Sequence, residues 1–364
     1  MTLTVLFYVL VAVFSVQIIY HLYFLVFCFS KEKETSIPSI PVSVIVYTKN
    51  SNENIKKNLA KILNQNYLNF EVVVVNNASF DDTYYTLEDF QREFKHLKVV
   101  NVENTEAFWG NKKYALTLGV KAAQNEHLIF TEIDARPISD NWLASMASRF
   151  HSEKEIVIGY SKFDTTKMSF LGILVRFEHL LKHVASLSFA KYGSPYYTDE
   201  KNFAYTKSTF FRVKGYINHI KLPAKHSDLF VKEASTKKNT TITTAPNSFI
   251  SIPLPTSFLS WYNTIALEAF NGKNYKFKHR SLTNLYFVSK VAFYICATLL
   301  LILNWQLSLP FILVYLLFRY IIVGKASNKL KEKNLIFFVP LLEICLLLIQ
   351  ISIFIKIRIS KPSL

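Results

Sequence analysis

The chain has 364 residues, 51% of them hydrophobic, and a formal net charge of +16 at pH 7. This length accommodates one sizeable domain together with a second, separate part. The three cysteines, Cys28, Cys296 and Cys345, lie in or beside long apolar segments, which excludes disulfides, thiolate metal sites and cysteine nucleophiles from the rest of the chain.

The second part is predicted to be membrane-embedded. Residues 3–29 are almost continuously apolar, and no small-residue cleavage site follows them, which favours an uncleaved anchor over a signal peptide. Three further segments of this kind follow near the other end, at residues 286–304, 309–323 and 335–355. The last contains Pro340 and Glu343, which we expect to face protein or the membrane interface. We therefore expect an anchor over residues 1–30 and a membrane region over residues 285–364.

Basic residues cluster beside these segments, around residues 31–33, 273–280 and 325–333. This positive-inside distribution places the globular part on the cytoplasmic face, against anionic lipids, and makes nucleic acid an unfavoured partner. One conflict is left open. Four spans would put the basic tail with Lys356, Arg358 and Lys361 on the opposite face. Either the last segment does not cross, or this weak signal is overruled.

The globular part alternates short apolar strands with helical patterns. Strands are predicted at residues 42–48, 70–75, 97–102 and 127–130, and helices at 55–64, about 81–94 and 111–125. Alternation with short connections predicts an α/β domain with a mostly parallel sheet. A further helical pattern at residues 170–187 fits either a core-facing helix or a cationic helix lying in the membrane surface.

Two acids end the fourth strand in the stretch Thr131-Glu132-Ile133-Asp134-Ala135-Arg136-Pro137. Alternation puts Glu132 and Asp134 on one side of the chain, at the sheet edge where ligands bind in open α/β folds. One interpretation is a divalent-metal site that holds a diphosphate. The other is a polar exit from a strand into a loop.

The order of motifs around these acids resembles the family 2 glycosyltransferases, specifically a membrane-anchored bacterial subgroup. The opening strand with Asn50 and Glu53 looks like the first strand and Asn-Glu turn of that family. The other matching segments are residues 69–83, 112–117, 131–137, 202–208 and 228–231.

The resemblance implies a GT-A-like fold for residues 36–284. It also implies a nucleotide-diphospho-sugar donor, inversion at the anomeric carbon, a Mg²⁺ or Mn²⁺ ion, and a lipid-linked or envelope glycan acceptor at the bacterial inner membrane. Carried over residue by residue, it assigns nucleotide binding to Thr48, Asn50, Glu53, Asn77, Lys112 and Glu132. The resemblance assigns metal binding to Asp134 and Glu132, and catalysis to Asp228 and His226.

Several positions depart from the family pattern. Asn77 stands for an Asp that contacts the base, and Glu132 for the first Asp of the metal pair. His226 occupies the position of the general base, where Asp228 orients it or serves instead; alternatively His226 is a polar loop residue. Residues 264–268 contain no basic residue where the family has an arginine that binds the diphosphate. Residues 198–201 stand where the family has a glycine-rich acceptor segment.

These departures leave a second functional hypothesis open. The protein is then a catalytically impaired subunit or binding protein in a glycan-assembly complex, with an intact paralogous glycosyltransferase as partner.

Overall fold

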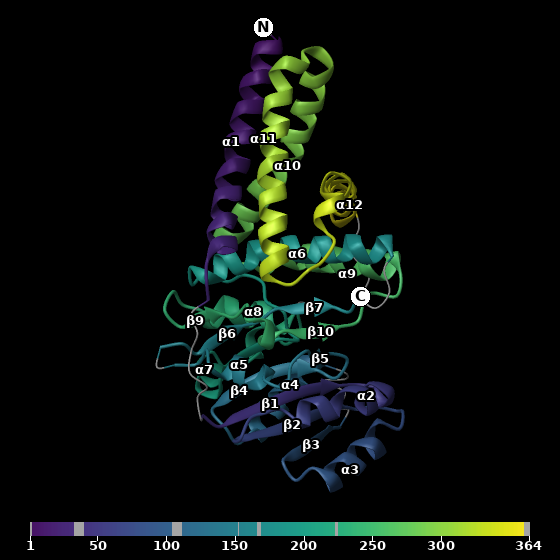
Figure 1. The fold of residues 1–364 in the computed structure, drawn as a ribbon. Coiled ribbons are helices and arrows are strands. Elements are labelled where there is room, and N and C mark those ends of the chain that lie inside the picture. Colours follow the sequence, from purple (N-terminus) through teal and green to yellow (C-terminus); the bar gives the residue numbers. More distant parts are fainter. Residues whose placement is uncertain are drawn as a thin grey trace. The chain divides into compact units, whose positions relative to one another are not determined.

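A computed structural model describes residues 2–32, 40–103, 111–151, 153–165, 169–222 and 225–359 (Figure 1). The chain divides into two compact units. One, here the catalytic unit, comprises residues 32–167 and 189–254. The other, here the membrane unit, comprises residues 1–31, 168–188 and 255–364. The boundaries predicted at residues 30, 36 and 284 remain predictions.

The catalytic unit is built on a seven-stranded sheet in the order β3-β2-β1-β4-β8-β6-β9. Strands β1 to β4 pair in parallel, as predicted, and the short β8 pairs antiparallel with both β4 and β6. The strands are β1 (Val42–Thr48), β2 (Phe70–Asn77), β3 (Leu97–Val102), β4 (His127–Glu132), β6 (Ile156–Ile158), β8 (Phe203–Thr206) and β9 (Thr240–Ile242). A second sheet joins β5 (Arg136–Pro137), β10 (Ile250–Ile252) and β7 (Ser161–Phe163).

Three helices connect the parallel strands β1 to β4: α2 (Asn52–Leu63), α3 (Thr83–Glu93) and α4 (Lys112–Ala122). The later helices are α5 (Trp142–Ala147), α7 (Lys207–Arg212) and α8 (His226–Ala234), with 3-10 turns at Ile217–His219 and Pro246–Ser248. The three predicted helices are confirmed. The first begins three residues earlier than predicted, at Asn52, and the third ends at Ala122 rather than at residue 125.

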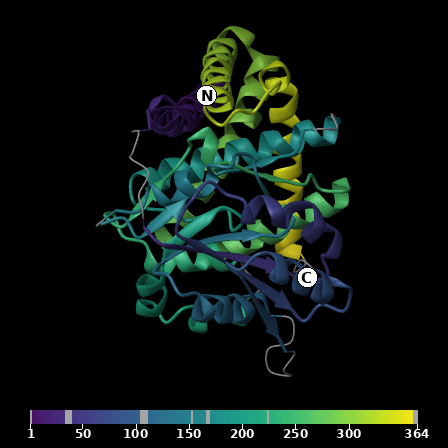
Figure 2. The same ribbon diagram turned by 60° about the horizontal axis from the view of Figure 1, so that its bottom comes forward.

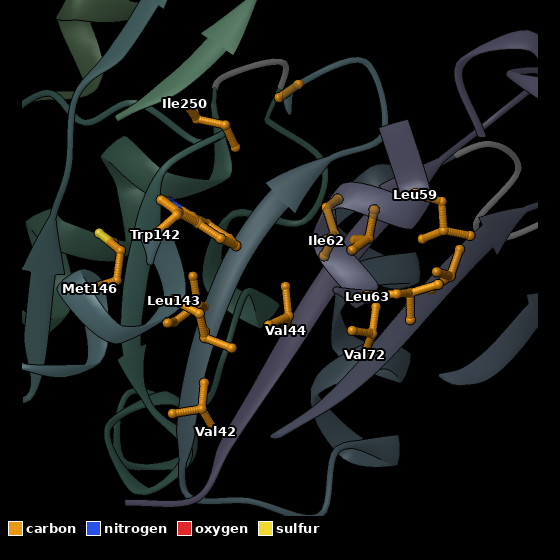
Figure 3. Close-up of a cluster of buried hydrophobic side chains, with 14 of the residues drawn as sticks. Val42, Val44, Leu59, Ile62, Leu63, Val72, Trp142, Leu143, Met146 and Ile250 are labelled. Carbon is orange, nitrogen blue, oxygen red and sulfur yellow. The ribbon is translucent and has the colours of Figure 1, made fainter. Parts of the chain in front are cut away.

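The core lies between the sheet and these helices. Side chains from β1, β2, α2 and α5 gather in one cluster in which Val44, Val72, Ile62 and Leu143 are fully buried (Figure 3). Residues 72–75 are all buried because helices or strands cover both faces of a central parallel strand, which explains the unbroken valine run.

Within its described residues, the membrane unit contains four helices long and apolar enough to cross a membrane: α1 (Thr2–Phe29), α10 (Phe277–Leu303), α11 (Trp305–Lys329) and α12 (Val339–Ile359). The unit also holds α9 (Phe258–Asn271), most of α6 (Phe170–Lys191), and 3-10 turns at Gly272–Asn274 and Ile336–Phe338. Helices α1, α10 and α11 pack lengthwise as a bundle (Figure 1) around a cluster that includes Leu10, Phe293 and Leu300.

Several polar side chains of this unit are paired with one another. Gln17 donates to the Ser289 hydroxyl at 2.7 Å. Glu343 is fully buried and forms ion pairs with Arg319 and with Lys290, the latter at 3.2 Å. The expectation that Glu343 faces protein is confirmed, because a carboxylate in an apolar surrounding requires a cationic partner.

Helix α6 carries the pattern predicted at residues 170–187. Its apolar residues Phe177, Leu180 and Val184 are buried, as a core-facing helix requires. Two of its basic residues are paired inside the membrane unit: Arg176 with Glu332 at 2.6 Å, and Lys182 with Glu268 at 2.7 Å. The helix thus combines a buried apolar stripe with membership of the membrane unit.

Candidate active site

The carboxyl ends of three parallel strands meet where the strand order reverses. Strand β1 pairs with β2 on one side, so that Thr48 lies opposite Asn76. It pairs with β4 on the other, so that Tyr47 lies opposite Glu132. Such a reversal leaves a crevice at the strand ends, which is where open α/β sheets bind ligands. The predicted acid pair therefore lies at the chemically expected place.

The turn that carries the acids is fixed by its backbone. Ile133 donates its N–H to the Tyr47 carbonyl at 3.1 Å, and Ala135 donates to the Glu132 carbonyl at 3.0 Å. From α2, the buried Asn58 side chain donates to the Ile133 carbonyl at 2.8 Å. Ile133 itself is buried, and the side chains of Glu132 and Asp134 both project toward Lys201.

Two lysines form ion pairs with these acids. Lys201 Nζ is 2.6 Å from Asp134 Oδ2 and 3.2 Å from Glu132 Oε2. Lys112 pairs with Glu132, and also with Glu200 at 2.9 Å. The site is thus a chain of alternating charges, carboxylate to ammonium, that runs from Asp134 to Glu200.

The pKa values follow from this alternation. Burial would lower the pKa of both lysines, but the carboxylates around them outweigh it and raise the pKa of Lys112 and of Lys201. Burial would likewise raise the pKa of Glu132, yet Lys112 and Lys201 hold it below its ordinary value. Lys112, Lys201 and Glu132 are therefore charged at neutral pH.

Each lysine is held by an anchored neighbour. Asn111 caps α4, because its side chain accepts from the backbone N–H groups of Lys113 and Tyr114. Asn202, next to Lys201, donates to the carbonyls of Tyr160 and Ser248 and accepts from the Trp142 indole at 3.1 Å. These contacts fix the backbone from which both ammonium groups reach the acids.

The two predicted catalytic residues lie at the start of α8. His226 is buried, and its Nδ1 lies 2.9 Å from Glu200 Oε2. Asp228 accepts from the Thr198 backbone N–H at 2.8 Å, so it fixes the segment that carries Glu200 and Lys201. His226 therefore belongs to the charged cluster, whereas the Asp228 carboxylate contacts its supporting backbone.

The predicted nucleotide-binding residues line two adjoining loops. Asn50, in a left-handed conformation with φ 48°, accepts from the Phe80 N–H at 2.8 Å, which ties the loop after β1 to the loop after β2. Asn77 donates to the Tyr47 hydroxyl at 2.9 Å. Thr48 is buried with no hydrogen-bond partner for its hydroxyl among the described residues, and Glu53 is exposed in the first turn of α2.

The structure thus brings together Lys112, Glu132, Asp134 and His226 from the predicted set. It adds Glu200 and Lys201, which the sequence analysis did not assign to the site. The sequence did offer one signal for Glu200 and Lys201: two adjacent charged residues stand where the family has a glycine-rich segment. Charged side chains that become buried near a cleft require partners of opposite charge.

A divalent cation fits this site at one oxygen. Asp134 Oδ1 is buried and has no hydrogen-bond partner among the described residues, and such an orphaned carboxylate oxygen is a hard-cation ligand. The other Asp134 oxygen, Oδ2, forms an ion pair with Lys201. The residues that would hold the ion are Asp134 and, after Lys201 moves, Glu132.

The fold and the site together define a GT-A-like domain: a mostly parallel α/β sheet with acids at the end of β4. The profile described as Glycosyl transferase family 2 matches residues 43–222, and this part of the chain belongs to that family.

Two similar proteins accompany the family match. An uncharacterized glycosyltransferase of Haemophilus influenzae is 27% identical over 138 residues, which are 38% of this chain and 38% of that protein. A solved structure, the mannosyltransferase PcManGT from Pyrobaculum calidifontis in complex with GDP-Man and Mn²⁺, covers 90% of this chain and 99% of its own, with a TM-score of 0.61 and 16% identity. At that identity the likeness establishes the fold.

Protonation of His226 is expected to weaken the fold in mild acid. Burial lowers the pKa of His226, and the Glu200 carboxylate offsets this only in part. The unfolded chain therefore binds this proton at a higher pH than the folded chain does. The stabilisation is complete above about pH 6.5, the ordinary histidine value, and is lost as the pH falls below it.

Urea titrations in detergent between about pH 7 and about pH 5 measure this effect. We expect the stability of His226→Gln to fall less steeply with acid than that of the wild type. His127 and His219, whose pKa values burial also lowers, remain in both proteins. The exposed His151 gives the control His151→Gln, which should keep the wild-type slope. Equal slopes for His226→Gln and the wild type would contradict the argument.

Proposed function

We propose that this protein is a membrane-bound glycosyltransferase that moves a sugar from a nucleotide-diphospho-sugar to a lipid-linked or envelope glycan acceptor, with inversion. The observation that carries the proposal is the cluster of Glu132, Asp134, Lys112 and Lys201 at the end of β4 in a family 2 glycosyltransferase domain. Cations and acids at this edge are what a diphosphate leaving group requires.

The donor nucleotide would lie on the loops after β1 and β2, which Asn50 ties together. Asn77 at the end of β2 would contact the base through an amide rather than a carboxylate. Lys112, at the N-terminus of α4, would bring an ammonium group to the diphosphate, reinforced by the positive end of the dipole of that helix.

Asp134, with Glu132, would hold a Mg²⁺ or Mn²⁺ ion. When bound, such an ion neutralises the charge that develops on the departing diphosphate. The solved mannosyltransferase with this fold contains Mn²⁺ and GDP-Man.

His226 would accept the proton of the acceptor hydroxyl. Burial keeps the pKa of this imidazole below its ordinary value, so the side chain is neutral and able to accept a proton near pH 7. The Glu200 carboxylate beside Nδ1 would orient the ring and stabilise the imidazolium that forms. Asp228 would act through the Thr198 backbone it fixes.

The catalytic unit would lie on the cytoplasmic face of a bacterial inner membrane, a location supported by the lysines and arginines clustered beside the apolar segments. This location suits an acceptor carried on a lipid.

One observation favours the second hypothesis, a catalytically impaired binding subunit. Lys112 and Lys201 already neutralise Glu132 and Asp134 from within the chain. A site kept only as a structural ion-pair cluster would show the same pairing, and its partner would be an intact paralogous transferase.

Calorimetry with GDP, UDP and Mn²⁺ on purified protein, followed by hydrolysis assays over a panel of nucleotide-sugars, separates the hypotheses. Transfer activity predicts nucleotide binding that strengthens with Mn²⁺, together with slow donor hydrolysis. If the protein showed neither nucleotide binding nor hydrolysis of any donor, transfer activity would be refuted and the binding-subunit hypothesis would remain.

Lys201→Ala is expected to strengthen Mn²⁺ binding. Its ammonium lies 2.6 Å from Asp134 and 3.2 Å from Glu132, where it competes with any second cation. Removing one charge a few ångström away at the effective dielectric of a partly buried site changes affinity by about tenfold to a hundredfold. Titration of Mn²⁺ without nucleotide measures the change. Lys201→Arg keeps the charge and should bind Mn²⁺ as the wild type does; an unchanged affinity in Lys201→Ala would contradict the competition.

A further inference from the structure

We propose that α12 lies along the surface of the membrane instead of crossing it, so that the chain has three spans, and that α9 and α12 together contact the acyl–headgroup boundary of an anionic leaflet. The proposal rests on the membrane location proposed above and is independent of glycosyl transfer. It resolves the conflict between four apolar segments and a basic tail.

Contacts at one end of the bundle show which helix ends lie together there. Lys329 Nζ, at the end of α11, lies 2.6 Å from the Ser30 carbonyl, just after α1. The Tyr20 hydroxyl donates to the Leu282 carbonyl near the start of α10 at 2.7 Å. The ends of α1 and α11 and the start of α10 therefore share one end of the bundle, here called the domain end. Helix α10 runs away from this end and α11 returns to it.

Two contacts on α10 fix the course of α12. Near its start, Glu343 lies 3.2 Å from Lys290; near its end, the Phe354 ring lies 5.4 Å from the Phe287 ring, centroid to centroid. The two α12 residues are eleven positions apart, about 16 Å along a helix, whereas the two α10 residues are three apart, about 4.5 Å. A spanning α12 would run parallel to α10 and bring Phe354 level with Leu301. Helix α12 instead crosses α10 at a steep angle.

The second half of α12 contacts α9 rather than the bundle. The Tyr262 hydroxyl lies 3.2 Å from the Ser352 hydroxyl, and Lys356 donates to the Asn263 side chain at 3.1 Å. The two views agree: α12 is seen down its axis where α1 and α11 are seen lengthwise (Figure 1), and along its length after the turn of view (Figure 2). Helix α9 leads, through a short turn, into the start of α10, so it belongs to the domain end.

The charges agree with this course. A spanning α12 would carry Lys356 and Arg358 to the far side of the membrane, against the bias of the other juxtamembrane segments. Lying in the surface, the helix keeps both on the side of Lys325 and Lys329. Basic residues near an anionic leaflet are attracted to its surface.

Exposed apolar side chains identify the lipid as the partner. Within the membrane unit, α9 exposes Phe258 and Leu259, and α12 exposes large apolar side chains along its whole length. Those of α12 are Leu341, Ile344, Leu348, Phe354, Ile355 and Ile359. Both helices adjoin the spans, and basic residues lie in the last turn of α12 (Lys356 and Arg358) and just after α9 (Lys273). An acyl–headgroup boundary therefore supplies the matching apolar and anionic surfaces.

Single-cysteine labelling in membrane vesicles tests the topology. In a background with Cys28, Cys296 and Cys345 changed to alanine, a membrane-impermeant maleimide is applied from each side to Arg358→Cys. The controls are Lys325→Cys at the domain end of α11 and Gln306→Cys at the opposite end of the bundle. We expect Arg358→Cys to label from the same side as Lys325→Cys. Labelling of Arg358→Cys from the same side as Gln306→Cys would overturn the proposal. Labelling of both controls from one side would instead refute membrane insertion itself, and the proposal with it.

Spin labels at Leu341, Leu348 and Ile355 test the lipid contact in vesicles containing anionic lipid. A helix in the surface places the three labels at similar depth and open to lipid-borne quenchers. A spanning helix would separate the first and last by about 21 Å in depth. Labels shielded from lipid, as by a second copy of the chain or another protein, would also overturn the proposal.

Discussion

Asp134→Ala is expected to lower nucleotide-sugar turnover by at least about a hundredfold. Asp134 supplies the one carboxylate oxygen in the site that is buried and without a hydrogen-bond partner among the described residues. A divalent ion contributes several kcal/mol to a transition state that places charge on a diphosphate, and each 1.4 kcal/mol is tenfold in rate. Loss of its ligand should therefore remove most of the turnover and the Mn²⁺ enhancement of nucleotide binding.

The control for this change is Asp140→Ala, which removes an exposed carboxylate from the turn between β5 and α5. It should keep wild-type turnover, and both variants should unfold at wild-type denaturant concentrations within error. If Asp134→Ala left turnover unchanged, Asp134 would not be the metal ligand. If the wild type had no turnover either, Mn²⁺ calorimetry on both proteins would still decide the assignment.

The strand-helix repeat could be predicted from the sequence because its signals are local. Buried parallel strands are apolar on both faces, so β1, β2 and β4 stand out as uninterrupted runs. The later strands β6, β8 and β9 have only three or four residues, too few to show a period of two. Their pairing is set by contacts between distant parts of the chain.

The candidate site divides in the same way. Glu132 and Asp134 could be found because two acids end an apolar strand. Lys201 and Glu200 could not be assigned to them, since Lys201 is 67 residues away from Asp134 in the chain. The second contact of Lys112, with Glu200, spans 88 residues. Ion pairs of this range depend on how the loop before β8 folds back over β4.

The membrane unit shows a different limit. Hydropathy measures whether a segment is long and apolar enough to cross a bilayer, and by that measure α12 qualifies as well as α1. It carries no information on direction. The course of α12 is set by Glu343 at one end and by Ser352 and Lys356 at the other, polar groups whose partners lie on three other helices.

Glu343→Ala is expected to destabilise the membrane unit by about 3–5 kcal/mol, the usual effect of removing one partner from a buried ion pair. Glu343 is fully buried and its carboxylate neutralises both Lys290 and Arg319, which are themselves buried. Alanine leaves two cations in an apolar surrounding with no anion. Unfolding by a denaturing detergent, followed by loss of tryptophan and helix signals, measures the change.

Restoring an apolar core is expected to reverse most of this loss. The triple variant Lys290→Met, Arg319→Met and Glu343→Leu removes the cations along with the acid, and such replacements are often neutral or stabilising. Gln350→Ala, one residue changed elsewhere on α12, serves as the control and should stay near the wild type. Wild-type stability in Glu343→Ala would contradict the pairing. A triple variant no more stable than Glu343→Ala would mean that loss of packing, rather than unpaired charge, destabilised the single variant.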